Sequence, residues 1–289
     1  MEERVSFISD GLKLAGILHL PEARGPGARH AAFLVLHGFG SNKDGGGGTT
    51  VANMLAGLGY VALRFDFRGC GESEGERGRV ICKEQVRDTR NALSFLAARP
   101  DIDPKRIGVV GQSFGAAVAV YSAGVDRRVA ACISSGGWGD GAKKFRKQHA
   151  SRRAWKKFAS MMKEGKRRKR AGKPMSVPRY DIVPIPPRLR GNLAPGSIME
   201  FPFEVVETMY AFNANEVVGR IAPRPLLLLH SASDSVTPTE QSVELFERAG
   251  KPTDLHLIAD VDHFMFSEGN TLVIGLVRNW LAKYFPARV

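Results

Sequence analysis

The sequence predicts an α/β fold, with a mostly parallel sheet of about eight strands and helices on both of its faces. Short runs of apolar, β-branched residues recur along the chain with helical segments between them, as in parallel strands joined by crossover helices. These runs are apolar at successive positions, as expected of strands that are covered on both sides. The first two strands differ. Residues 5–8 and 12–20 alternate apolar and polar side chains around Asp10-Gly11, which predicts an antiparallel hairpin.

The later elements follow from composition and flanking residues. Thr49 or Thr50 is a candidate N-cap for a helix that runs to Leu58, and Gly59 ends that helix. Residues 81–98 carry apolar side chains at roughly helical spacing. The other strands are expected at 31–36, 60–65, 106–110, 129–134, 224–230 and 254–258, and further helices at 116–121, 239–249 and 271–284.

Residues 136–220 interrupt this alternation. We expect a helix over 142–163, a basic turn over 165–173, an irregular stretch over 174–202, where prolines are dense, and another helix over 203–212. The chain would then divide into a core, formed by 1–135 and 221–289, and an insertion, formed by 136–220. Ligands of open α/β sheets bind beyond the carboxyl ends of the strands, so an insertion at that edge would lie over the site as a lid.

The positive charge of the chain belongs to one segment. The 289 residues carry a net charge of +13, but 142–173 alone hold 15 lysines and arginines and one acid, and the rest is nearly neutral. Such a segment is either a solvated surface or attracts an anionic substrate or partner. Nucleic acid is disfavoured as that partner, because the aromatic residues Phe145, Trp155 and Phe158 fall where the helix should pack inward.

Composition also bounds the class and compartment. Apolar residues make up 43% of the chain and charged residues 25%, which is ordinary for a soluble globular protein. No apolar run reaches the length of a membrane span, and the first residues lack the layout of a signal peptide. Cys70, Cys82 and Cys132 are too few and too scattered for a disulfide framework or a zinc site, so a reducing cytoplasm is expected.

A serine at the end of one predicted strand is the candidate nucleophile. Gly111-Gln112-Ser113-Phe114-Gly115 matches G-x-S-x-G and stands between a predicted strand and a predicted helix. The flanking glycines have no Cβ, so the chain can turn sharply and lift the Ser113 hydroxyl out of the sheet. The free amides at the start of the helix favour negative charge beside that oxygen. Taken alone, the motif also fits a glycine-rich turn whose serine only caps the helix.

An acid and a base follow in loops after later strands. Asp234 and then His263 come after the nucleophile, and this is the chain order that G-x-S-x-G hydrolases use. Asp140 is an alternative acid, because it also follows a predicted strand. Asp262 is a weaker one, since a side chain rarely reaches the ring of its neighbour in sequence.

A tetrahedral oxyanion needs hydrogen-bond donors that are in place before the reaction. The backbone amide of Phe114 comes directly after the candidate nucleophile, and that of Phe39 lies in the loop after the strand 31–36. Both donors belong to the main chain, so the backbone conformation of the two loops decides whether these amides can bind the oxyanion.

Together these stretches resemble the α/β-hydrolase superfamily, and most of all its dienelactone-hydrolase and prolyl-oligopeptidase-like branch of small serine esterases. The matching stretches are the oxyanion loop at 37–40, the D-x-R-G-x-G-x-S region at 64–73, the nucleophile elbow at 111–115, the acid loop at 231–238 and the base at 262–264. The resemblance covers the chain outside 136–220 and implies the α/β-hydrolase fold. It also implies that His37 braces the oxyanion loop, and that Asp66 and Arg68 hold their loop by hydrogen bonds or an ion pair.

The combination predicts a metal-free serine hydrolase that cleaves a carboxylic ester. Ser113 would attack the acyl carbon, His263 would move the proton, and Asp234 would orient the imidazole. The same residues could cleave a thioester, an amide or peptide, or a C–C bond, or transfer an acyl group, because the lid would choose the leaving group. An alternative of another class is a binding protein that uses the basic lid.

No cofactor is expected. The glycines 45–48 invite a nucleotide-binding interpretation, but they lack the fingerprint of a phosphate loop or of a dinucleotide fold. Clustered metal ligands are not apparent either. The expected partner is therefore a small-molecule ester, with an anionic one favoured if the basic segment serves the site, and the sequence indicates no oligomeric state.

Overall fold

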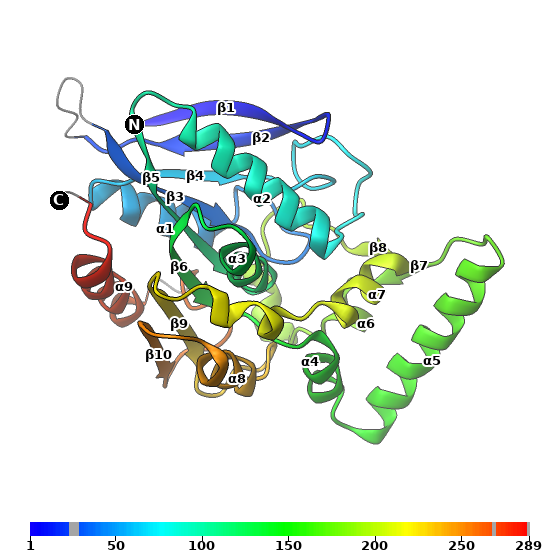
Figure 1. Ribbon diagram of the computed structural model, residues 1–289. Coiled ribbons are helices and arrows are strands. Elements are labelled where there is room, and N and C mark those ends of the chain that lie inside the picture. Colours follow the sequence, from blue (N-terminus) through cyan, green and yellow to red (C-terminus); the bar gives the residue numbers. More distant parts are fainter. Residues whose placement is uncertain (23–28, 268–269, 288–289) are drawn as a thin grey trace.

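The computed structural model of the chain describes residues 1–22, 29–267 and 270–287 (Figure 1). An eight-stranded sheet lies at its centre, in the order β1-β2-β4-β3-β5-β6-β9-β10. The first two strands form the antiparallel hairpin, β2 is also antiparallel to β4, and every further pair is parallel. The fold class predicted from the sequence is thus confirmed. The strands of this sheet are β1 (Glu2–Ser9), β2 (Leu12–His19), β3 (His30–Leu36), β4 (Val61–Phe65), β5 (Ile102–Gln112), β6 (Val129–Ser135), β9 (Leu226–Ser231) and β10 (Thr253–Ile258).

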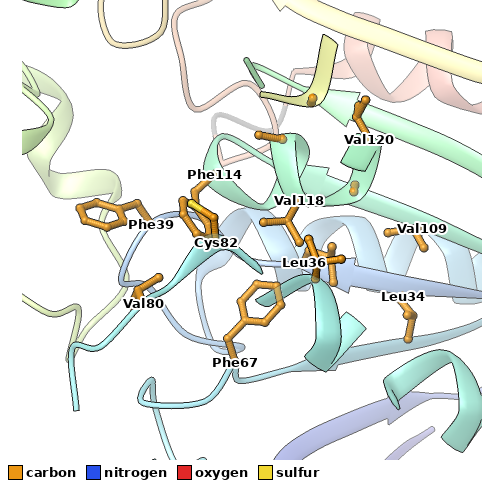
Figure 2. Packing of buried hydrophobic residues seen from close by; sticks show 14 of the residues in the cluster. Leu34, Leu36, Phe39, Phe67, Val80, Cys82, Val109, Phe114, Val118 and Val120 are labelled. Carbon is orange, nitrogen blue, oxygen red and sulfur yellow. The ribbon is translucent and has the colours of Figure 1, made fainter. Parts of the chain in front are cut away.

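Helices cover both faces of the sheet, and alternate side chains of each central strand face opposite layers. Leu34 and Leu36 of β3 join the cluster under α2 (Cys82–Ala97), α3 (Phe114–Val125) and α8 (Glu240–Arg248), as Figure 2 shows for α3. Phe33 and Val35 join the second cluster, under α1 (Gly46–Gly57) and α9 (Thr271–Tyr284). Both sides of the strand are therefore buried, which explains why its sequence is apolar throughout.

The parallel strands bring their carboxyl ends to one edge of the sheet. β3 and β5 are neighbours there, although β4 lies between them in the sequence. The chain leaves β3 toward one side and returns in β5 on the other, so this edge is a topological switch point. The loops after β3 and β5 diverge at that point, and they carry Phe39 and Ser113.

The start of α1 was predicted incorrectly. The helix begins at Gly46, with Gly45 as an N-cap that has no side chain, rather than at Thr49 or Thr50. The reason is a close approach to the loop after β5, because a Cβ on Gly47 would overlap the side-chain amide of Gln112. The glycines thus let the first turn of the helix pack where a larger residue would not fit.

The basic part of the insertion also differs from the prediction. In place of one helix over 142–163 and a turn over 165–173, the chain forms α4 (Gly141–Gln148) and α5 (Arg152–Arg170). The break is stabilised from both sides, since the His149 ring bonds the Phe145 carbonyl (3.0 Å) and the Ser151 hydroxyl caps α5. Gly165 lies within α5, and the ring of Phe203 occupies the place that a Cβ would need. It is a packing glycine, not a turn.

The rest of the insertion is built from short elements, as the dense prolines predict, and its helix over 203–212 is present as α7. Its apolar side chains join the hydrophobic cluster of α2 and α3, while α5 extends away from the sheet (Figure 1). No helix in the described ranges has the length and apolar character needed to cross a membrane. The short elements are β7 (Ser176–Pro178), α6 (Arg179–Ile182), η1 (Pro187–Asn192), β8 (Glu200–Pro202), α7 (Phe203–Ala211), η2 (Ala214–Glu216) and η3 (Val218–Arg220).

Candidate active site

The turn between β5 and α3 holds Ser113 in a strained backbone conformation, with φ 54° and ψ −115°. A residue other than glycine seldom adopts a positive φ, and the conformation costs on the order of 1–3 kcal/mol. Both flanking glycines are required by sterics. A Cβ on Gly111 would overlap the Gly115 carbonyl, and one on Gly115 would lie 2.5 Å from the carbonyl oxygens of Leu36 and His37. The motif therefore forms the sharp strand-to-helix turn expected of it.

Three loops at this edge bring Ser113, Asp234 and His263 together. His263 Nε2 lies 2.8 Å from Ser113 Oγ, and its Nδ1 lies 2.8 Å from Asp234 Oδ2. An ionised carboxylate can only accept, so Nδ1 carries a proton and donates it to Asp234. In the neutral imidazole this leaves Nε2 free to accept the Ser113 hydroxyl. The ring is thus in the tautomer that a general base for Ser113 needs.

Asp234 is kept ionised by its surroundings. Its side chain is fully buried, and burial acts to raise the pKa of the carboxyl, but the contacts with His263 and His230 hold that pKa well below its usual value. The second oxygen, Oδ1, accepts from the backbone amides of Val236 and Thr237, each at 2.7 Å. These bonds fix the carboxylate plane and aim Oδ2 at the imidazole.

The two alternative acids are engaged elsewhere. Asp140 caps α4 by accepting from the Lys143 amide at 3.0 Å. Asp262 accepts from the side chains of Ser235 and Arg188, and from the backbone amide of His263 (2.8 Å) rather than its ring. Of the three candidates, only Asp234 meets the ring within the described residues.

His230, which lies near the carboxyl end of β9, is also part of this cluster. The residue is fully buried, and its Nε2 lies 3.0 Å from the Thr237 carbonyl and 3.3 Å from Asp234 Oδ2. Both neighbours are acceptors, so Nε2 carries the proton, and Nδ1 accepts from the Ser242 hydroxyl at 2.6 Å. The available signal was its position four residues before Asp234, at the end of a strand.

The candidate oxyanion loop lies beside the nucleophile. A Cβ built on Gly38 would stand 3.8 Å from the Ser113 Cβ, and the ring centroids of Phe39 and Phe114, both labelled in Figure 2, are 5.9 Å apart. Phe114 is the first residue of α3, so its N–H has no acceptor within the helix. Phe39, Ser113 and His263 line one cavity, together with Arg179, Val183 and Ile185 of the insertion.

The bracing residues make the contacts expected of them. The Phe67 amide donates to His37 Nε2 (3.2 Å), so Nδ1 carries the proton and donates to the Gly38 carbonyl (2.9 Å). Burial lowers the pKa of this ring, which favours the neutral form. Asp66 accepts from the amides of Lys43 (2.5 Å) and Glu72 (2.9 Å). Arg68 pairs with the buried Asp88 at 2.6 Å. These side chains hold the loops that surround the cavity.

No cluster of metal ligands accompanies the site in the part of the chain that the structure describes. Across 1–22, 29–267 and 270–287, no group of three or more His, Cys, Asp or Glu residues is arranged to hold a metal ion. The glycines 46–48 form the first turn of α1.

A strained serine after the central strand of a doubly covered parallel sheet, with an acid and a base on later loops, defines an α/β hydrolase. The chain belongs to the alpha/beta hydrolase family, whose model matches residues 33–274.

The relatives carry several activities in their names. Polyketide transferase claH of Penicillium crustosum is 27% identical, over 92% of this chain and 92% of its own. Thiohydrolase aneE of Aspergillus aculeatus is 39% identical, over 45% of this chain and 40% of its own. The crystal structure of the alpha/beta hydrolase GrgF from Penicillium sp. sh18 superposes with a TM-score of 0.78 at 21% identity, over 98% of this chain and 99% of that one, and shares the fold.

Proposed function

We propose that this protein is a serine hydrolase that cleaves a carboxylic ester through an acyl-enzyme. The observation that carries the proposal is the chain of hydrogen bonds from Ser113 through His263 to Asp234, at 2.8 Å for each step. A buried acid, an oriented imidazole and a strained serine at one cavity have the geometry of an activated nucleophile.

The reaction follows from these contacts. Ser113 Oγ attacks the acyl carbon while His263 Nε2 takes its proton, and the Asp234 carboxylate stabilises the imidazolium that forms. The amides of Phe39 and Phe114 donate to the oxyanion, and each such donor contributes on the order of 10²–10³ in rate. His263 returns the proton to the leaving alcohol, and water then cleaves the acyl-enzyme by the same route.

A second candidate function uses the same acyl-enzyme but a different leaving group or a different acyl acceptor. Thioester cleavage, or transfer of the acyl group to an acceptor other than water, uses the same residues. The names of the relatives, polyketide transferase and thiohydrolase, favour this variant of the proposal. The alternative of a binding protein is less favoured, because a binding role alone gives no reason to align all three residues.

We propose that residues 136–220 act as the lid over this site, with 1–135 and 221–289 as the core. Support comes from the side chains of Arg179, Val183 and Ile185, which line the same cavity as Ser113. The space open to the centre of a water molecule in that cavity is only about 70 Å³. The lid therefore favours a small acyl group.

The compartment is part of the same proposal. The three cysteines are free and buried, which supports a reducing cytoplasm.

The test combines a covalent probe with matched substrates. A fluorophosphonate should label Ser113. The Ser113→Ala variant should not be labelled, and its turnover should fall by about 10⁴-fold or more. An oxygen ester and a thioester with one small acyl group, each assayed with water alone and with added alcohols, would separate hydrolysis from transfer. Absence of labelling in the folded wild-type protein would overturn the proposal.

A further inference from the structure

A buried arginine of the insertion contacts the candidate oxyanion loop directly. Arg179, the first residue of α6, is 3% exposed. Its Nη2 donates to the Phe39 carbonyl at 2.5 Å, and its Nη1 to the carbonyls of Ile198 (2.8 Å) and Gly40 (3.5 Å). One guanidinium thus joins the loop after β3 to the strand-like segment before β8.

These bonds complete the support of the Phe39 amide. That N–H belongs to the peptide whose carbonyl is Gly38 O, and His37 Nδ1 donates to this oxygen at 2.9 Å. The next peptide along the chain is the one that Arg179 holds through the Phe39 carbonyl. Peptide units are planar, so fixing one carbonyl on each side of the Phe39 Cα fixes the direction of its N–H. The core supplies the first contact and the insertion supplies the second.

Packing reinforces the same connection. The Phe201 ring of β8 stacks on the Phe39 ring, with centroids 4.2 Å apart and planes at 20°. Gly40 has a φ of +51°, and a Cβ there would overlap Phe201 and stand 3.2 Å from Arg179 Nη1. The Ile198 amide donates to the Gly40 carbonyl at 2.8 Å. The loop therefore has a glycine where the insertion approaches most closely.

The charge of Arg179 has no counterion beside it. No carboxylate of the described residues lies within 4.0 Å of its guanidinium, and its Nε has no hydrogen-bond partner. Burial lowers the pKa of the guanidinium to about 10, so it remains charged at neutral pH. A desolvated cation without a counterion costs free energy, and an anion that forms in the cavity that Arg179 lines would offset that cost.

We propose that Arg179 is the positioning residue of the oxyanion hole, holding the Phe39 amide toward the Ser113 oxyanion and favouring that negative charge with its own. The inference rests on the proposed acyl-enzyme function. It makes the insertion a working part of the site, in addition to a cover over it.

Arg179→Gln should lower kcat by about 10²–10³, the effect of losing one oxyanion donor, while KM changes by less than threefold. A small boronic acid, which forms a tetrahedral adduct with Ser113, should lose affinity in step with kcat/KM. The alcohol product, which carries no charge, should bind as it does to the wild type. Arg179→Lys retains a cation but not the two donor nitrogens of the guanidinium, so it should recover part of the rate and of the boronate affinity.

Arg190→Gln is the matched control. Arg190 lies in the same insertion, donates to the Ile185 carbonyl (3.1 Å) and stacks over the Tyr180 ring (3.9 Å), but it makes no hydrogen bond with the oxyanion loop among the described contacts. It should leave kcat and boronate affinity near wild-type values.

The outcomes separate the inference from the proposed function. If the wild-type protein is not labelled by a fluorophosphonate, the proposed function fails and the inference fails with it. If the wild type is labelled and turns over, but Arg179→Gln keeps kcat or keeps its boronate affinity, only the inference is overturned. If Arg179→Gln does not fold, the Arg179→Lys variant decides. If that variant has the kcat and the boronate affinity of the wild type, donation from both Nη1 and Nη2 is not needed and the inference is overturned.

Discussion

Replacing Lys144 with methionine should stabilise the protein. This lysine of α4 is 1% exposed, and its Nζ has no hydrogen-bond partner within the described residues. The ammonium instead faces the rings of Trp138, at 4.5 Å, and Phe145, at 4.1 Å. Burial lowers its pKa from an ordinary 10.5 to about 7. Methionine has a similar length and flexibility and carries no charge to desolvate.

The magnitude follows from the shift in pKa. At pH 7 the unfolded chain has a fully protonated lysine, whereas the folded protein binds about half a proton, so the buried amine costs about 4 kcal/mol of stability. Contact of the ammonium with two aromatic rings returns about 1–2 kcal/mol. The methionine variant should therefore gain about 2–3 kcal/mol, equivalent to a rise in Tm of about 5 °C in a protein of this size.

The pH dependence has a definite sign. The pKa of this lysine is lower in the folded protein, so the unfolded chain binds more protons between about pH 7 and 10.5, and wild-type stability rises across that window. The advantage of the methionine variant is full below pH 7, and it should narrow by about 2 kcal/mol at pH 9.5. Urea denaturation of both proteins at pH 7 and at pH 9.5 measures this difference in the free energy of unfolding.

The control is Lys143→Met on the same helix. That side chain is 57% exposed and pairs with Glu244, so its loss should change stability by about 1 kcal/mol or less at either pH. A Lys144→Met protein less stable than the wild type at pH 7, or an advantage that does not change with pH, would refute the reasoning.

Three further results are expected. Asp234→Asn should lower kcat by about 10⁴-fold by allowing the wrong imidazole tautomer, whereas Asp262→Asn should stay near the wild-type rate, and the reverse order would move the acid role to Asp262. Asp88→Asn should destabilise the protein by about 2–3 kcal/mol in urea, since it removes the buried carboxylate that pairs with Arg68 and leaves Asp10, at 2.8 Å, as the remaining counterion, and a loss below 1 kcal/mol would contradict this. If the basic segment steers substrate, kcat/KM for an anionic ester should fall as salt is added, and kcat/KM for a neutral ester of equal size should not. Replacing residues 166–170 with glutamates should abolish this difference between the two esters. Identical salt responses of the two esters would mean that the segment is only a solvated surface.

The sequence alone determined the fold class and the positions of the candidate residues. Apolar runs and helical spacing are local properties, so the eight strands and most of the helices between them could be predicted. Ser113, Asp234 and His263 were found because parallel strands place their carboxyl ends at one edge, and each residue lies in the connection that follows such an end. The flanking glycines of the elbow were also predictable, because the backbone conformation they permit is a local requirement.

Only the tertiary structure decided which groups touch. The sequence offered three acids for His263, and the ring of His263 meets Asp234 because the loops after β9 and β10 lie side by side. The contact of His230 with Asp234 had only the four-residue spacing as a signal in the sequence, and the contact of Arg179 with Phe39 had none. The second joins residues 140 positions apart, and such a contact leaves no period or spacing in the sequence.

Glycines show the same division between local and distant causes. Gly165 suggested a turn, because a missing side chain favours many backbone conformations when the chain is considered alone. It is helical in the folded protein, and the ring of Phe203, 38 positions away, fills the place that a Cβ would need, so packing requires the glycine there. The sequence specifies what each residue permits locally, and packing against distant residues selects among the permitted conformations.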